Sequence, residues 1–206
     1  MKITWMGHSC FKIEEGGYSI VTDPYSDGSV PGLKDVRTEA DAVYCSHEHK
    51  DHNARECVTI RNSGAAAFAV TELASYHDEA KGTKRGDNTI RIFTTPTAKL
   101  VHFGDLGCMP EPEQLEALRG ADLVMIPVGG FFTIDAAEAK AVLDAIAPRA
   151  VIPMHYRDDQ LGFGYDMIGT VEEFTKQYTQ VTEVKSSELE LNKEMAGIYV
   201  MTPANR

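Results

Sequence analysis

The segment 45-CSHEHKDH-52 limits the possible folds of this chain more than any other part of the sequence. It places His47, His49, Asp51 and His52 within six positions, directly after the apolar run 42-AVY, and so uses three of the chain's seven histidines. Side chains two residues apart can point to the same side of an extended backbone. Imidazole and carboxylate groups suit zinc, with iron or manganese as alternatives that geometry would have to exclude. The spacing therefore predicts a metal site on a loop after a buried strand.

Three further candidate ligands each end an apolar run elsewhere in the chain. His77 is the last residue of 71-TELASYH, Asp105 of 98-AKLVHFGD, and His155 of 149-RAVIPMH. A preorganised site on a rigid scaffold needs ligands that are presented from strand ends. We therefore expect these three side chains to join the loop cluster. For His77, two alternatives stay open: it is a loop histidine near the mouth of the site, or the adjacent Asp78 is the donor.

The rhythm of apolar runs and turn residues predicts layers of strands and helices, in an α/β or α+β arrangement. Helix formers and acidic first turns predict helices over 68–82 and 111–122. The segment 135-DAAEAKAVLDAIAPRA predicts an amphipathic helix that is capped by Asp135 and stops before Pro148. The predicted strands are the runs of the first fifty residues, then 90–95, 98–105, 122–130 and 150–155, and a final edge strand at 197–201.

Length and charge narrow the class of protein. A chain of 206 residues fits one compact domain, 1–206. A net charge of -11 argues against nucleic acid or anionic membranes as partners. The first residues lack the features of an export signal, and no stretch is long and apolar enough for a membrane span, so we expect a cytoplasmic protein. The four cysteines form no C-x-x-C pair and are expected to be free thiols.

Taken in order, these motifs resemble those of the metallo-β-lactamase superfamily. The segment 47–52 matches its H-x-H-x-D-H motif, and 22-TDP, a later histidine, 104-GD and the histidine after 150-AVIP follow in the same order. The segment 7-GHSCF is similar to the opening of a compact bacterial branch, near the ascorbate-6-phosphate lactonases and metal-dependent hydrolases. The resemblance covers nearly the whole chain. It implies an α+β fold, the αββα sandwich, with two mixed sheets packed face to face and helices outside.

The resemblance also implies a site for two metal ions, with two Zn²⁺ per chain expected and Mn²⁺ or Fe as alternatives. The implied ligands are His47, His49 and His77 for one ion, Asp51, His52 and His155 for the second, and Asp105 as the bridge. A water shared by two cations becomes a hydroxide near neutral pH, because metal binding lowers its pKa to about 7. Asp51 is expected to orient this hydroxide as the catalytic residue.

The expected activity is hydrolysis of an ester, lactone or phosphoester bond in a small molecule, with a lactone or phosphodiester as the first choice. A non-catalytic metal-binding or partner-binding module would be expected to lack a ligand, whereas all seven positions are filled. A di-iron redox member would carry glutamate in place of His49 and a flavin domain. A nuclease would need an inserted domain, and only about fifty residues separate Asp105 from His155. Whether the protein forms a homo-oligomer is left open.

Several residues beside the cluster have expected roles. Asp23 follows an apolar run, where a carboxylate needs a partner, and we expect it to hydrogen-bond to a ligand histidine. His102 lies inside an apolar run and is expected to be a core histidine with its hydrogen bonds satisfied. His8 is either a contact near the metals or a turn histidine. The candidates for substrate contact, with two arginines suited to carboxylate or phosphate, are Arg85, Asn88, Phe131, Phe132, Tyr156 and Arg157.

Overall fold

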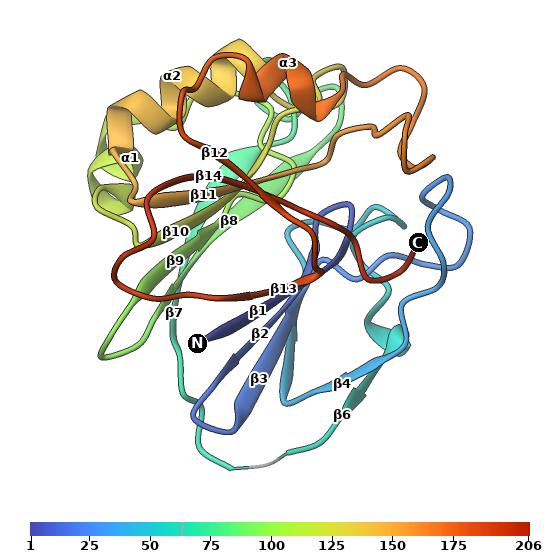
Figure 1. Ribbon diagram of the computed structural model, residues 1–206, viewed down its shortest axis with the longest axis vertical. Helices are drawn as coiled ribbons and strands as arrows, with labels where there is room; N and C mark the ends of the chain where they lie inside the picture. The colour runs from blue at the N-terminus through green and yellow to red at the C-terminus, as the bar shows by residue number, and fades with distance from the viewer. Residues whose placement is uncertain (63) are drawn as a thin grey trace.

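Two β-sheets face each other across one apolar core in the computed structural model, which describes residues 1–62 and 64–206 (Figure 1). The first sheet has the order β13-β1-β2-β3-β5 and the second the order β12-β14-β11-β10-β9-β8-β7. Rings meet between the sheets: Phe11 contacts His102 with centroids 5.9 Å apart, and Tyr44 contacts Phe93 at 5.4 Å. The predicted sandwich of two mixed sheets is confirmed.

The strands of the first sheet are β1 (Lys2–Gly7), β2 (Cys10–Glu15), β3 (Tyr18–Thr22), β5 (Ala42–Tyr44) and β13 (Glu188–Glu190). The strands of the second are β7 (Ala69–Tyr76), β8 (Asp87–Thr94), β9 (Lys99–His102), β10 (Leu123–Pro127), β11 (Ala150–Met154), β12 (Val181–Val184) and β14 (Gly197–Met201). A small sheet pairs β4 (Thr38–Ala40) with β6 (Val58–Ile60) and lies next to the 3₁₀ helix η1 (Arg55–Cys57).

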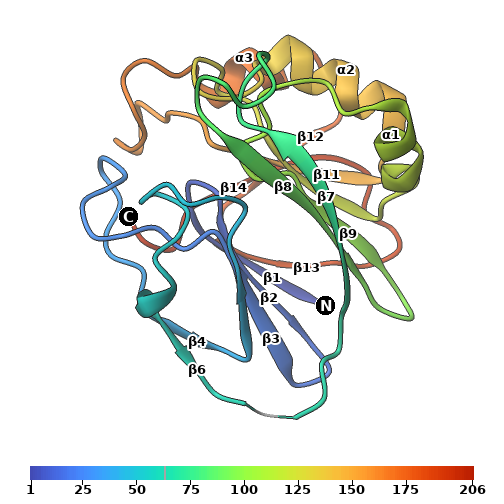
Figure 2. The ribbon, with the colours of Figure 1, turned by 180° about the vertical axis from the view of Figure 1, so that it is seen from behind.

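The helices α1 (Pro112–Leu118), α2 (Ala136–Ile146) and α3 (Val171–Thr175) lie on the outer side of the second sheet (Figures 1 and 2). The predicted capping of α2 is confirmed, because the Asp135 carboxylate accepts the backbone N–H groups of Ala137 and Glu138. One face of α2 is buried against the sheet, and the helix ends where Ala147 turns left-handed before Pro148. The predicted helix at 111–122 is also confirmed, as the shorter α1.

Two predictions about the strands were wrong. The segment 68–82, predicted as a helix, contains β7, which pairs with β8 over eight positions from Ala69 to Tyr76. The strand β14 does not lie at the sheet edge, because β12 pairs with it on one side and β11 on the other. In both cases strand pairing that the local composition does not show decides the structure.

Strand direction explains where a site can form. In the first sheet β1 and β3 both run antiparallel to β2, and β5 runs parallel to β3. In the second sheet β9 and β11 run parallel to β10, and β7 and β9 both run antiparallel to β8. In the first sheet β1, β3 and β5 therefore share one direction, and in the second sheet β7, β9, β10 and β11 do. Their carboxyl ends meet at one edge of the sandwich.

Two further sequence predictions concern membrane-spanning segments and the cysteines. No helix of the described residues has the length and apolar character needed to cross a membrane. The structure describes all four cysteines, and each of them is a free thiol, as predicted.

Candidate metal centre

Six of these co-directed strands are each followed by a candidate site residue. The loops after β1, β3 and β5 carry His8, Asp23 and the 47–52 motif, and those after β7, β9 and β11 carry His77, Asp105 and His155. The three residues His8, Asp23 and His155 have positive φ angles of 52°, 43° and 52°. Backbone strain of this kind, at non-glycine residues, gathers at functional sites. The strand ends thus bring together residues that are up to 147 positions apart in the chain.

A first group of donors consists of His47, His49 and His77, whose ring nitrogens lie within 4.8 Å of one another. His47 Nε2 and His49 Nδ1 are 3.0 Å apart. Two nitrogens bound to one tetrahedral zinc ion, each at 2.0–2.1 Å, lie about 3.3 Å apart. The observed spacing therefore fits a shared ion.

A second group consists of His8, Asp51, His52 and His155, and its donor atoms also lie within 4.8 Å of one another. Asp51 Oδ2 is 3.5 Å from His8 Nε2 and 3.7 Å from His52 Nε2. The rings of His8 and His155 have centroids 4.2 Å apart. The structure therefore brings the three predicted members together and adds His8.

Asp105 lies between the two groups. Its Oδ2 atom is 3.1 Å from His52 Nε2 and 3.2 Å from His155 Nε2 in the second group. The same atom is 3.4 Å from His77 Nε2 and 4.0 Å from His47 Nε2 in the first. One buried carboxylate oxygen thus faces nitrogens of both groups, which is the position that a bridge between two cations requires.

Several buried donor atoms of the cluster have no hydrogen-bond partner among the described residues. They are His8 Nδ1 and Nε2, His52 Nε2, His77 Nδ1, His155 Nδ1 and Asp105 Oδ1. A buried polar atom without a partner costs about 1–3 kcal/mol, so hydrogen bonding within the protein does not account for this arrangement. Buried nitrogen and carboxylate donors without partners fit divalent metal ions.

A second layer of hydrogen bonds holds these donors in place. Asp23 accepts hydrogen bonds from the backbone N–H and the hydroxyl of Ser46, both at 2.6 Å, and lies 2.9 Å from His52 Nδ1. The predicted contact between Asp23 and a cluster histidine is thus confirmed. Asn88 accepts the backbone N–H of Asp105 at 3.0 Å and donates to the carbonyl of Phe103. These contacts fix the orientation of one histidine ring and of the loop that carries Asp105.

The close approach of the Gly104 backbone to two side chains completes this support. A Cβ atom on Gly104, which has a φ of 56°, would lie 2.4 Å from Ser46 Cβ and 2.4 Å from Asn88 Oδ1. Only glycine allows the Asp105 loop to come this near to the 45–52 loop.

The electrostatics of the cluster favour a bound cation. Burial, reinforced by neighbouring histidines, lowers the pKa of His8 to about 4 and that of His47 to about 3, so both are neutral at pH 7. Burial alone would raise the pKa of Asp105, but the nearby His155 and His52 hold it well below its usual value. For His52, burial is outweighed by Asp105 and Asp23, which raise its pKa. The neutral His8 and His47 rings beside the ionised Asp105 are in the protonation states that bind metals, whereas His52 would release a proton on binding a metal ion.

A cavity of about 350 Å³ opens onto the cluster. Five donor residues line it, namely His49, Asp51, His77, Asp105 and His155. The other lining residues are Arg85, Phe132 and Tyr165, and the rings of Phe132 and Tyr165 meet with centroids 5.8 Å apart. A substrate in this cavity would touch donors on one side and two aromatic rings and an arginine on the other.

Only some of the predicted substrate contacts line the cavity. Arg85 and Phe132 line the cavity, whereas Phe131 is 62% exposed and packs against Phe132. The predictions for Asn88 and Tyr156 were wrong: Asn88 is buried behind Asp105, and Tyr156 is buried against Trp5 with ring centroids 5.6 Å apart.

Three further residues that the sequence singled out form contacts within the protein and lie outside the donor cluster. Arg157 does not line the cavity and pairs with Asp159 at 2.9 Å. Asp78, the alternative donor beside His77, instead accepts four backbone N–H groups of the following loop. His102 is a satisfied core histidine, as predicted, with Nε2 2.9 Å from the Ser9 carbonyl and Nδ1 accepting the Gly104 N–H.

Sequence reasoning missed the role of Tyr165. Its hydroxyl lies 3.0 Å from Asp51 Oδ2 and 2.6 Å from the Ser29 carbonyl oxygen, and its ring contacts His8. Tyr165 lies in the loop between β11 and α3, which has no apolar periodicity that would point to the site. The only local signal is the pair of glycines at 162 and 164 just before it, which marks a turn but not its target.

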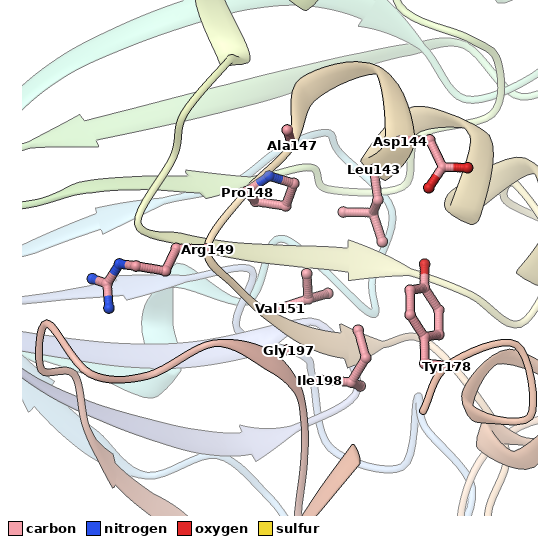
Figure 3. A pocket seen from close by; sticks show the side chains of 9 residues that line it. All are labelled: Leu143, Asp144, Ala147, Pro148, Arg149, Val151, Tyr178, Gly197 and Ile198. Carbon is pink, nitrogen blue, oxygen red and sulfur yellow. The ribbon is translucent and has the colours of Figure 1, made fainter. Parts of the chain in front are cut away.

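A second hollow, of about 300 Å³, lies near the start of β11, at the other end of this strand from His155 (Figure 3). Leu143, Val151 and Ile198 give it an apolar wall, with Tyr178 at its side. Both of its charged residues are paired, Arg149 with Asp122 at 3.0 Å and Asp144 with Lys140 at 2.7 Å. No histidine or cysteine is among its lining residues, so it offers no donors comparable with those of the cluster.

Comparison with known proteins agrees with this geometry. A family model described as "Beta-lactamase superfamily domain" matches residues 2–155. A UPF0173 metal-dependent hydrolase of Caldivirga maquilingensis is 28% identical, over 75% of this chain and 81% of that protein. A UPF0173 protein of Pyrococcus abyssi is 30% identical, over 76% of this chain and 83% of that protein.

A solved structure is also similar over nearly its full length. It is that of a Thermotoga maritima protein classed with the Zn-dependent hydrolases of the metallo-β-lactamase superfamily, with 31% identity, a TM-score of 0.76 and coverage of 97% of both chains. The chain therefore belongs to the metallo-β-lactamase superfamily and is one of its metal-dependent hydrolases.

Proposed function

We propose that this protein hydrolyses an ester, lactone or phosphoester bond of a small molecule with two divalent metal ions, zinc in the simplest case. The observation that carries the proposal is the place of Asp105 Oδ2, within 3.1 to 4.0 Å of nitrogens from both donor groups. His47, His49 and His77 would hold one ion, and Asp51, His52, His155 and His8 the other. Bound metal supplies Lewis acidity and lowers the pKa of water to about 7.

Within this proposal Asp51 orients the attacking water. It lines the cavity, and although burial favours its neutral form, the neighbouring His8 and His52 lower its pKa, so it is ionised at pH 7. An ionised carboxylate can accept a hydrogen bond from water. Tyr165 has one hydroxyl hydrogen and can donate it to Asp51 Oδ2 or to the Ser29 carbonyl. In the first arrangement it fixes one oxygen of Asp51 and leaves the other for the water.

The size of the cavity supports a small substrate. A volume of about 350 Å³ lies at the lower end of the range for small-molecule sites, about 300–1,000 Å³. Phe132 and Tyr165 shield one side of the cavity from bulk water, which strengthens electrostatic interactions inside it. Hydrolysis there would break the bond between the acyl carbon or phosphorus and the leaving oxygen, with water supplying the new oxygen and the proton of the leaving group.

Metal content and activity can be measured on the same samples. We expect elemental analysis of the untagged, metal-replete protein to give about two ions per chain, and both His77→Ala and Asp105→Asn to lower this content. His102→Gln is the control, because His102 is a buried histidine outside both donor groups. The metal-loaded protein is then assayed with para-nitrophenyl esters, lactones and phosphodiesters.

Each outcome separates the alternatives. Less than one ion per chain in the metal-replete protein would overturn the proposed ligand set. Two ions without turnover of any of the three bond classes would favour a non-catalytic metal-binding module of the same fold.

A further inference from the structure

Arg85, unlike nearly all other arginines of this chain, has no ion pair with a carboxylate. Seven of the nine arginines lie within 4.0 Å of a carboxylate oxygen. Among the described residues, only Arg85 and the C-terminal Arg206 have no such ion pair. The chain carries 31 acidic residues, so acidic partners are abundant. Unlike the chain terminus, Arg85 is half-buried and lines the cavity beside the donor cluster.

The backbone around Arg85 is fixed by a buried carboxylate. Asp78 Oδ2 accepts the N–H of Arg85 at 2.7 Å and that of Lys84 at 3.0 Å, while Asp78 Oδ1 accepts two earlier N–H groups of the loop. The His77 N–H donates to the Gly86 carbonyl at 3.0 Å and closes the loop. Arg85 is therefore presented next to the candidate ligand His77 by a loop with a defined shape.

The side chain of Arg85 lies against an aromatic ring. Its guanidinium carbon is 5.7 Å from the centre of the Phe132 ring, which itself contacts Phe131 and Tyr165. A guanidinium over an aromatic face is stabilised by the ring, and its N–H groups remain free at its edge. Two of these N–H groups can bind one carboxylate or phosphate in a bidentate manner. Arg85 is thus a preorganised cation in the cavity whose anionic partner is not supplied by the protein.

On the basis of the hydrolase function proposed above, we propose that the substrate carries a terminal oxyanion group, a carboxylate or a phosphate, which Arg85 binds while the scissile bond lies at the donor cluster. Asp51 and Asp105 occupy the cluster side of the cavity and would repel such a group unless metal ions are bound. Arg85 therefore directs the anionic end away from the reacting bond and selects small anionic esters or lactones over neutral ones.

Matched esters test this role on the metal-loaded protein. Para-nitrophenyl butyrate and the para-nitrophenyl monoester of succinate differ by a methyl group in place of a carboxylate, and the ester of 3-phosphonopropionate presents a phosphorus oxyanion instead. We expect kcat/KM, after subtraction of the enzyme-free rate, to be higher for the anionic esters. Arg85→Met should lower it about 10- to 100-fold for these esters, mainly through KM, and change the butyrate value little. Whichever anionic ester loses more identifies the preferred oxyanion.

Two variants and a binding measurement sharpen the test. Arg85→Lys keeps the charge but loses the bidentate fork and should recover part of the loss. Arg119→Met is the control, because Arg119 is exposed, pairs with Glu116 at 2.8 Å and does not line the cavity. Titration calorimetry with succinate should show weaker binding to Arg85→Met and unchanged binding to Arg119→Met.

The outcomes distinguish this role from the hydrolase function. Equal turnover of butyrate and succinate esters, or an equal loss for both in Arg85→Met, would overturn the role of Arg85 and leave the hydrolase function standing. Absence of all turnover with two metals bound would count against the hydrolase function. Calorimetry would still decide the role of Arg85 in that case, since unchanged succinate affinity in Arg85→Met would overturn it.

Discussion

The Asp23 carboxylate lies 2.9 Å from Nδ1 of His52 and joins the end of β3 to the loop after β5. Because Nδ1 of His52 is occupied by this contact, Nε2 is the nitrogen that faces Asp105, at 3.1 Å. A carboxylate behind a histidine sets the tautomer and the ring orientation of a metal ligand and raises its basicity. Asp23 is thus a positioning residue for one nitrogen of the second donor group.

Replacement of Asp23 by asparagine should weaken metal binding. Asparagine tolerates the left-handed backbone at this position, where φ is 43°, so the fold should persist. It carries no negative charge to hold His52, and loss of such a contact typically weakens metal affinity about 10- to 100-fold. Competition with a chelator measures the Kd. Asp27→Asn is the matched control, because Asp27 is an exposed acid paired with Arg37. Equal metal affinity of Asp23→Asn and the unaltered protein would contradict the role of Asp23.

Replacement of His8 by asparagine should weaken metal binding without lowering the stability of the metal-free protein. Both ring nitrogens of His8 are buried and have no hydrogen-bond partner among the described residues, so its side chain contributes no such bond to the fold. Asparagine again suits the positive φ of 52°. Urea unfolding of the chelator-treated protein measures stability, and chelator competition measures metal affinity.

His102 gives the opposite expectation and serves as the control for His8. Both of its nitrogens are hydrogen-bonded in the core, so His102→Gln should lower the free energy of unfolding by about 1–3 kcal/mol. It should not change metal affinity. If His8→Asn instead destabilised the metal-free protein and left metal affinity unchanged, His8 would be a turn histidine.

The ligand cluster could be predicted from the sequence because its residues follow apolar strands that end at one edge. His77, Asp105 and His155 each stand just beyond the end of a strand, and the motif at 47–52 marks where they meet. His8 follows a strand in the same way, yet its role was left open, because the missing hydrogen bonds that make it a candidate ligand are visible only in three dimensions.

The parts that could not be predicted depend on tertiary contacts that the local composition does not show. The strand β7 contains Ala, Glu and Leu, which favour a helix, and its pairing with β8 decides the outcome. The strand β12 has the short sequence VTEV, which contains no apolar run that would predict a strand, and it forms by pairing with β14. Tyr165 reaches Asp51 from a position 114 residues away, through a loop without periodic structure.

Replacement of Tyr165 by phenylalanine should reduce kcat about tenfold and leave the number of bound ions unchanged. The variant keeps the ring that packs on Phe132 but removes the hydroxyl 3.0 Å from Asp51, so the carboxylate is less well oriented. The control is Tyr178→Phe, since the Tyr178 hydroxyl is buried beside the second hollow without a hydrogen-bond partner in the described structure (Figure 3). A change in KM alone, with kcat constant, would show that Tyr165 only contacts the substrate.

The stability of the metal-free protein should fall as the pH drops below about 6.5. Burial lowers the pKa of His8 to about 4 and of His47 to about 3, and it also lowers the pKa values of His77 and His102 from 6.5. Below pH 6.5 the unfolded chain therefore binds protons at these four residues that the folded chain does not bind. His52 acts in the opposite direction, because Asp105 and Asp23 overcome the effect of burial and raise its pKa.

Four histidines outweigh one, so unfolding takes up protons, and each net proton lowers the free energy of unfolding by about 1.4 kcal/mol per pH unit. Urea unfolding of the chelator-treated protein between about pH 7.5 and 4.5 measures this slope. His8→Asn should make the slope shallower, because it removes one of the four groups. A free energy of unfolding that stayed constant or rose toward pH 5 would mean that these histidines are charged in the folded protein, and such charged rings would not be ready to bind a metal ion.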